Sequence, residues 1–346
     1  MFPVDFAFDV VKKYSKQGDL ILDPFAGRGS SIYAGGVLGR HSLGIEINPV
    51  GWLYGAVKLE PAAKAAVLSR LKEIDEKKRY YGEAMRKMPR FFRMCYCDAV
   101  LKFLISARRN LNWKHNAADA TLMSIILVYL HGKIGEGLSN QMRMTKAMGP
   151  DYSVRWWQEN GFSSPPELDP RELITRKIDW RYMKGQPRVF ESRVIFGDST
   201  VELERLVGKS EKTGVKFSLL FTSPPYCDVT DYHADQWLRL WLLGGPDQPK
   251  TIQEPNKGRF VNREKYRLLL EDVFGKCSKL MADESTVYVR TDKRQYTFET
   301  TLNVLTECFP NHKVEITDKP FQKRTQTELH GNKSTEKGEV DIVLTR

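Results

Sequence analysis

Short apolar runs alternate with helical patterns in two parts of the chain. The first 50 residues predict a helix over 2–18, a strand over 19–22, a helix after Gly29 and a second strand over 41–47. Beyond residue 190, the strands expected are 193–196, 219–221, 285–289, 313–316 and 340–345, with helices after 199 and over 266–281 and 298–308. We expect the last two strands to pair antiparallel, with the polar stretch 323–337 as a mobile loop between them. Strands that alternate with helices indicate a parallel sheet, so the pattern predicts an α/β fold.

Residues 51–190 break this alternation. Apolar spacing predicts helices over 61–90, 98–109 and 117–131, whereas 140–161 fits neither a helix nor a strand. We therefore expect two parts: a sheet domain of residues 1–50 and 191–346, and a mostly helical insert of residues 51–190.

The insert carries all the excess positive charge. The chain has a net charge of +11, and residues 51–190 contain 25 Lys and Arg against 14 Asp and Glu. Within 140–161, basic side chains alternate with aromatic ones, a pattern typical of surfaces that grip phosphates and stack on bases. The candidates for nucleic-acid binding are Arg143, Lys146, Arg155 and Trp156. A solvated basic face, with the Trp pair buried as an anchor, fits the same residues.

The stretch 217–226, FSLLFTSPPY, combines a buried strand with an abrupt end. Pro224 and Pro225 lack N–H groups and cannot continue the strand, so the carbonyl oxygens here stay free at the edge of the sheet. With the hydroxyl of Ser223 and the ring of Tyr226, these acceptors suit an exocyclic amino group on a stacked base. Taken alone, the two prolines also fit an ordinary turn with a packed tyrosine.

A second stretch, 23–31 (DPFAGRGSS), lies between the first strand and its helix. Its glycines allow the backbone to approach a ligand, and the helix N-terminus adds positive potential. Glu46 ends the next strand, where an acid suits ribose hydroxyls. The third glycine of a dinucleotide-binding fingerprint is replaced by Ile32, which argues against a nicotinamide-dependent oxidoreductase.

The two stretches together resemble those of S-adenosylmethionine-dependent DNA amino-methyltransferases. Residues 23–30 (DPFAGRGS) match the cofactor loop of that family, and 222–226 (TSPPY) match its catalytic segment; the likeness covers 1–50 and 190–346. The resemblance implies a Rossmann-like sheet of seven strands with helices on both faces. It also implies transfer of a methyl group from S-adenosylmethionine to the amino group of a base flipped out of double-stranded DNA.

The same resemblance implies the roles of individual residues. The loop would hold the methionine part of the cofactor, Glu46 its ribose, and Asp198 with Ser199 its adenine end; Asp98 is an alternative to Asp198. Ser223 and the Pro224 carbonyl would bind the amino group, and Tyr226 would stack on the base. The residues expected at the cofactor are Asp23, Pro24, Phe25, Ala26, Gly27, Gly29, Ser30, Glu46, Asp198 and Ser199, and those expected at the reacting amine are Ser223, Pro224, Pro225 and Tyr226.

Serine at position 223 resembles the N4-cytosine branch of the family, since N6-adenine enzymes carry Asp or Asn there. N6-adenine methylation, methylation of RNA and a non-catalytic nucleic-acid-binding protein are the alternatives. Five scattered cysteines and the lack of an N-terminal signal predict a cytoplasmic protein with reduced thiols and no zinc. Analogy suggests a restriction-modification role with a cognate nuclease, and a monomer or weak dimer.

Overall fold

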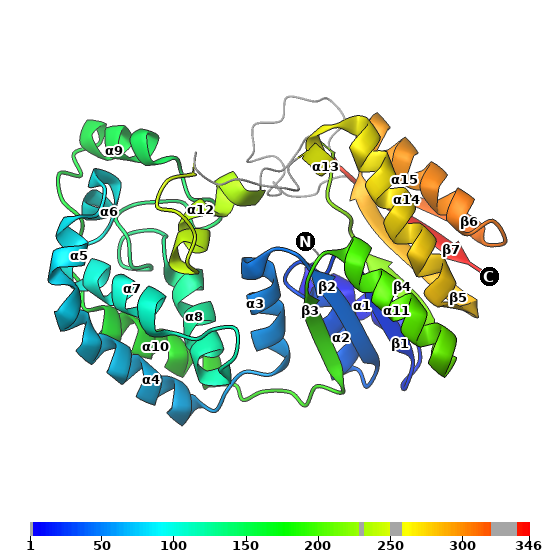
Figure 1. Ribbon diagram of the computed structural model, residues 1–346, viewed down its shortest axis with the longest axis horizontal. Coiled ribbons are helices and arrows are strands. Elements are labelled where there is room, and N and C mark those ends of the chain that lie inside the picture. The colour runs from blue at the N-terminus through cyan, green and yellow to red at the C-terminus, as the bar shows by residue number, and fades with distance from the viewer. Residues whose placement is uncertain (1–2, 228–231, 250–257, 320–337) are drawn as a thin grey trace. The chain divides into compact units, whose positions relative to one another are not determined.

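The computed structural model describes residues 3–227, 232–249, 258–319 and 338–346 (Figure 1). It divides into two compact units. The sheet unit consists of Met1–Leu59, Pro187–Thr230 and Glu254–Arg346, and the helical unit of Glu60–Gln186 and Asp231–Gln253. Residues 232–249, which the sequence analysis placed with the sheet domain, therefore belong to the helical unit. The predicted loop 323–337 lies outside the described residues.

The sheet has seven strands in the order β3-β2-β1-β4-β5-β7-β6, as expected for a Rossmann-like methyltransferase fold. Strands β1 to β5 are parallel, and β7 runs antiparallel to both β5 and β6. The strands are β1 Leu20–Asp23, β2 His41–Glu46, β3 Ser192–Phe196, β4 Phe217–Thr222, β5 Met281–Asp292, β6 Lys313–Lys319 and β7 Glu339–Thr345.

Helices cover both faces of this sheet (Figure 1). Alternate residues of a strand point to opposite faces, so β1 sends Leu22 into one core and Ile21 into the other. The first core packs under α11 (Ser199–Thr213), α14 (Arg263–Leu280) and α15 (Gln295–Cys308), and the second under α1 (Val4–Tyr14) and α2 (Ser30–Val37). Two further helices of this unit are α3 (Pro49–Leu59) and α13 (Gly258–Val261). The C-terminal edge of the parallel strands is thereby held on a rigid, two-sided frame.

The helical unit contains more breaks than its sequence pattern predicts. The single helix expected over 61–90 is wrong: the chain forms α4 (Lys64–Lys77), a 3₁₀ turn (Lys78–Tyr81) and α5 (Gly82–Arg86). Two tyrosines and a glycine, all weak helix formers, lie at that break. The helices expected over 98–109 and 117–131 are confirmed as α7 (Asp98–Asn110) and α8 (Ala117–Tyr129).

Four more helices complete the described part of this unit: α6 (Arg90–Cys95), α9 (Pro150–Glu159), α10 (Pro170–Tyr182) and α12 (Tyr232–Leu242). The sequence analysis missed α9 and α10, although each begins with a proline, which is favoured in the first turn of a helix. Trp157 of α9 and Trp237 of α12 both pack against Phe91, with ring centroids 5.6 and 5.0 Å apart.

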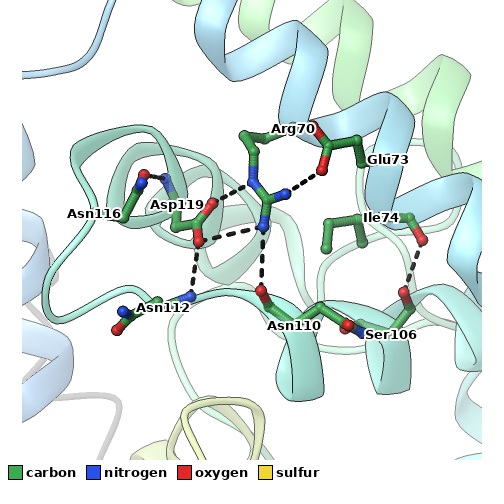
Figure 2. A network of polar contacts seen from close by, with 8 residues as sticks. All are labelled: Arg70, Glu73, Ile74, Ser106, Asn110, Asn112, Asn116 and Asp119. Atoms are coloured by element: carbon green, nitrogen blue, oxygen red, sulfur yellow. Dashed lines mark hydrogen bonds and ion pairs between the residues drawn. The ribbon is translucent and has the colours of Figure 1, made fainter.

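An ion pair between the half-buried Arg70 and the buried Asp119 joins α4 to α8, and Arg70 also contacts α7 (Figure 2). The Arg70 guanidinium donates to both carboxylate oxygens of Asp119, over 2.6 and 3.3 Å, and to the carbonyl of Asn110 over 3.2 Å. Asp119 also accepts the backbone N–H of Asn112 at 2.8 Å. The Asn116 side chain caps α8 by accepting the N–H of Asp119 at 3.0 Å. Figure 2 shows how this carboxylate closes the loop between α7 and α8 onto α4.

Substituting Asp119 by Ala is expected to lower the unfolding free energy of the helical unit by about 2–3 kcal/mol, because Arg70 loses its buried carboxylate partner and the Asn112 N–H loses its acceptor. The exposed pair between Lys64 and Asp179 supplies the control, and Lys64→Met should cost less than about 1 kcal/mol. Urea denaturation of both variants measures the difference. Equal losses would show that the pair between Arg70 and Asp119 contributes no more than a surface pair.

Candidate cofactor and amino-group site

The two stretches singled out in the sequence meet at one edge of the sheet. Strands β1 and β4 are parallel neighbours, with Ile21 opposite Leu219 and Leu22 opposite Leu220. The Thr222 hydroxyl at the end of β4 donates to Oδ1 of Asp23, at the end of β1, over 2.6 Å. A buried hydrogen bond thus joins the cofactor loop (residues 23–31) to the residue immediately before the SPPY segment (residues 223–226).

The buried carboxylate of Asp23 accepts hydrogen bonds from other residues of the cofactor loop. The donors are the backbone N–H of Phe25, at 3.0 Å, and the hydroxyl of Ser31. The carbonyl of Pro24 accepts the hydroxyl of Ser199, and the N–H of Ala26 donates to the carbonyl of Ile45 at 3.0 Å. With the bond from Thr222, the loop is therefore fixed to β4 on one side of β1, and to β2 and the start of α11 on the other.

Glycines are required where this loop turns. Gly27 and Gly29 have φ values of 54° and 66°, which side chains rarely adopt. An added Cβ at Gly29 would also lie 3.1 Å from the backbone of Gly55, whereas one at Gly27 would meet no atom within 4 Å. Gly27 thus borders open space, as a loop that admits a ligand must. Next to them, Ser30 is buried as the first residue of α2, and the half-buried Phe25 ring lies edge-on to Phe274.

Glu46 ends β2 at the same edge, as predicted. Its Oε2 accepts the N–H of Gly27 at 2.7 Å, and its Oε1 accepts the N–H of Asn48 at 2.7 Å. Each carboxylate oxygen has two lone pairs, so both keep capacity for a further donor. The half-buried carboxylate is therefore oriented and still able to accept hydroxyl groups.

Both acids titrate above their ordinary range. Burial raises the pKa of Asp23 to about 6, although Ser31, Thr222 and the Phe25 N–H oppose the shift. Burial also raises the pKa of Glu46 to about 7, against the N–H groups of Asn48 and Gly27, and the negative charge of Asp23 adds to the rise. Near neutral pH, the site is therefore poised between protonation states.

Because the pKa of Glu46 is raised on folding, the stability of the protein is expected to decrease as the pH rises. A glutamate whose pKa rises from 4.5 to about 7 on folding binds more protons in the folded state between those values, so its contribution is complete below pH 4.5 and lost above pH 7. For Glu46, which is half-buried, we expect a loss of about 1–3 kcal/mol over that interval. Urea denaturation of the wild type and of Glu46→Gln, each at pH 5 and pH 8, measures this contribution of Glu46 to the unfolding free energy. A wild-type protein that gains stability relative to Glu46→Gln on raising the pH would contradict the assignment.

Asp198 lies at the end of the neighbouring strand, β3. Its Oδ1 caps α11 by accepting the Thr200 N–H at 3.0 Å, and its Oδ2 accepts Nη1 of Arg259 at 2.6 Å. Burial alone would raise the pKa of Asp198, but the hydrogen bonds from Thr200 and Arg259 lower it below its usual value. The N–H of Gly197 donates to the Glu46 carbonyl at 3.1 Å, which places Asp198 beside β2. Asp98, the alternative, begins α7 in the helical unit.

The SPPY segment leaves β4 immediately after Thr222. Pro224 is buried, while Ser223, Pro225 and Tyr226 are half-buried. The hydroxyls of Ser223 and Tyr226 lie 3.4 Å apart, within hydrogen-bonding distance. A hydroxyl acceptor and an aromatic ring are thus held together at the sheet edge that carries the cofactor loop.

The four candidates for nucleic-acid binding all lie in the helical unit. Arg143 and Arg155 are exposed, and Lys146 forms an ion pair with Asp235. The Trp156 ring stacks on Phe162 at 5.7 Å. Its neighbour Trp157 is a core residue that donates to the Gln141 carbonyl at 2.7 Å.

Three residues at the site were missed in the sequence analysis: Thr222, Ser31 and Arg259. Thr222 and Ser31 belong to the quoted stretches, and a buried acid just before a turn is itself a signal that nearby hydroxyls will donate to it. Arg259 is about 60 residues from Asp198 in the chain, and no local sequence pattern predicts their contact.

The described residues include no helix that is long and apolar enough to cross a membrane. In the same part of the chain, no three His, Cys, Asp or Glu side chains are grouped so that they could hold a metal ion. The five cysteines are free thiols.

Comparison with known proteins bears on the part of the chain that contains the cofactor loop. Residues 1–50 match the family model of a DNA methylase. The type II methyltransferase M.MthZI of Methanothermobacter thermautotrophicus is 38% identical over 47 residues, which are 14% of this chain and 13% of that protein. The match thus spans about an eighth of the relative's length. These findings support an S-adenosylmethionine-dependent amino-methyltransferase.

Solved structures align over the whole chain at low similarity. TrmN from Thermus thermophilus is 8% identical, with 100% of this chain and 49% of that chain covered and a TM-score of 0.36. The rRNA methyltransferase aviRa from Streptomyces viridochromogenes is 10% identical, with 99% and 85% covered and a TM-score of 0.33. At these values the two structures add nothing to the topology described above.

Proposed function

We propose that the protein is a site-specific DNA methyltransferase that transfers a methyl group from S-adenosylmethionine to the exocyclic amino group of a flipped base, N4 of cytosine. The observation that carries the proposal is the hydrogen bond between Thr222 and Asp23. It holds a glycine loop suited to the cofactor and a segment suited to an amine within one site, as a direct transfer between the two ligands requires.

When bound, the cofactor supplies an activated methyl group on a sulfonium. The protein's part is therefore to position the methyl group against the amine and to exclude water. In the proposal the backbone around Gly27 borders the methionine part, and Glu46 accepts the ribose hydroxyls. Asp198 and Ser199 lie at the adenine end. The Ser199 hydroxyl is engaged by Pro24, so its part there is to fix the loop.

At the amine, the protein needs hydrogen-bond acceptors. The nitrogen lone pair of an aromatic amine is delocalised into the ring, and acceptors that bind its hydrogens help to localise it for attack. Ser223 and the carbonyl of Pro224 are the acceptors in this proposal, and the Tyr226 ring stacks on the base. A base must leave the duplex to reach them, at a cost of a few kcal/mol that the stack offsets in part.

The helical unit is proposed as the target-recognition region. Its excess of basic residues suits phosphates, and Arg143 and Arg155 are exposed cations suited to such contacts. Lys146 is paired with Asp235, and Trp156 with Phe162, so these two candidates would have to exchange partners to touch a nucleic acid. The restriction-modification role, with a cognate nuclease as partner, rests on the type II relative by analogy.

Methyl transfer can be tested directly. The protein is incubated with methyl-tritiated S-adenosylmethionine and duplex DNA or structured RNA, and the nucleic acid is digested to nucleosides. We expect label in N4-methylcytosine from DNA. Label in N6-methyladenine would overturn the choice of base, and label in RNA alone would overturn the substrate. Incorporation into neither, by a protein that binds the cofactor, would refute the proposed function.

A further inference from the structure

A carboxylate from the far half of the sheet reaches the SPPY segment. Glu339 is the first residue of β7 and lies opposite Asp292, the last residue of β5, in the antiparallel register. The start of β7 therefore lies at the edge where the parallel strands end. From there, Oε1 of Glu339 accepts the hydroxyl of Tyr226 at 3.3 Å, and that hydroxyl is 3.4 Å from Oγ of Ser223.

Glu339 is itself held in place by a buried cation. Its Oε2 lies 3.4 Å from Nη1 of Arg290, whose side chain is 9% exposed. Arg290 also donates two hydrogen bonds to Asp341, over 2.6 and 2.8 Å, and lies 3.6 Å above the ring of Phe6. A bidentate, buried guanidinium has little freedom to move, so it fixes the carboxylate that contacts Tyr226.

The backbone that follows Tyr226 is held by a second arginine, Arg294, which lies between the end of β5 and the start of α15. Nη2 of Arg294 donates to the carbonyl of Cys227 at 2.8 Å, and its Nε donates to Asp292 at 3.0 Å. Asp292 is buried at the end of β5. The ring tip and the chain just beyond the ring are thus both tied to β5 and β7.

We propose that Glu339 is a positioning residue for the reaction, acting through the hydroxyl of Tyr226 to set the ring on which the target base stacks. The inference rests on the proposed function and deepens it. A stacking ring must present its face within a narrow range of angles, and an error of about 1 Å in a reacting geometry costs on the order of 100-fold in rate. A fixed acceptor for the hydroxyl limits where the ring tip can lie.

Kinetics of three variants test the mechanism. Glu339→Val removes the acceptor and should lower kcat for methyl transfer about tenfold with the cofactor KM unchanged. Glu339→Gln keeps an acceptor oxygen at the same reach and should recover most of that loss, although it removes the charge that Arg290 contacts. In a Tyr226→Phe background, Glu339→Val should cost nothing further, because the hydroxyl through which it acts is absent.

A spectroscopic measurement tests the contact without nucleic acid or turnover. With 3-fluorotyrosine at position 226, the 19F resonance should shift in Glu339→Val and shift much less in Glu339→Gln. The control is Glu315→Gln, which alters an exposed glutamate on β6 and should leave the resonance in place.

The outcomes separate this inference from the proposed function. An unshifted resonance in Glu339→Val overturns the contact, and an active wild type with full kcat in Glu339→Val overturns the positioning role. Additive losses in the double variant overturn the route through the hydroxyl. A shifted resonance in a protein that methylates no nucleic acid refutes the proposed function, and the positioning role falls with it.

Discussion

Replacing Asp23 by Ala is expected to remove methyl transfer and to destabilise the sheet unit by about 2–4 kcal/mol. The carboxylate is buried and accepts three donors, from Thr222, Ser31 and the Phe25 N–H. Each buried donor left without an acceptor costs about 1–3 kcal/mol, offset in part because the raised pKa shows that burying this acid is itself unfavourable. An assay of methyl transfer and urea denaturation measure the two losses, and calorimetric titration with S-adenosylmethionine shows whether cofactor binding is lost with them.

Asp23→Asn separates the charge from the hydrogen bonds. The amide keeps one acceptor oxygen, and the Ser31 hydroxyl can turn to accept from its NH2 group, so stability should change by less than about 1 kcal/mol. The surface control is Asp283→Ala on β5, whose carboxylate is 98% exposed and should cost less than about 0.5 kcal/mol. If Asp23→Ala were as stable as Asp283→Ala and bound the cofactor normally, Asp23 would not join the two segments.

Tyr226→Ala is expected to lower kcat/KM for methyl transfer by about 5–150-fold, equivalent to about 1–3 kcal/mol, the usual worth of a stack between a base and an aromatic side chain. The role proposed for Tyr226 is to stack on the base and not to bind the cofactor, so the affinity for S-adenosylmethionine should be unchanged. Tyr226→Phe keeps the ring and should lose less than Ala. Steady-state assays with DNA, together with calorimetry for the cofactor, give both quantities.

Two outcomes would count against that role. Turnover unchanged in Tyr226→Ala would show that no base stacks on the ring. A cofactor affinity that falls in parallel with kcat/KM would show that the substitution disturbs the loop and not the base.

The sheet could be predicted from the sequence because its signals are local. Most strands contain a short apolar run, as at 217–222, and the two prolines after Thr222 mark the end of that strand. Antiparallel pairing of β6 and β7 followed from the same pattern and is confirmed. The positions of Asp23 and Glu46 at strand ends likewise followed from the alternation of strands and helices.

The helical unit was harder because its boundaries depend on packing between distant segments. Residues 61–90 have the composition of one helix, yet the chain breaks at Tyr80 and Gly82. The sequence analysis placed Trp237 in the sheet domain because of its position in the chain, but its ring packs against Phe91 and Phe92 of the helical unit. No local pattern indicates a partner about 145 residues away.

At the candidate site, too, local features could be predicted from the sequence and long-range contacts could not. The residue types of the SPPY segment could be read from the sequence, whereas the carboxylate that accepts the Tyr226 hydroxyl comes from β7, 113 residues later. The partner of Asp198, Arg259, is equally remote. The sequence therefore predicts which groups reach the sheet edge but not the long-range contacts that fix them there.

Photolabelling with methyl-tritiated S-adenosylmethionine, followed by mapping of the labelled peptides, tests most directly whether the methyl group lies between the two segments. Ultraviolet light links the labelled group to nearby side chains, and no nucleic acid is needed. We predict label in the peptides that contain Phe25 and Tyr226, and its loss in Asp23→Ala. Label confined to residues 60–186, with none at either segment, would contradict the account.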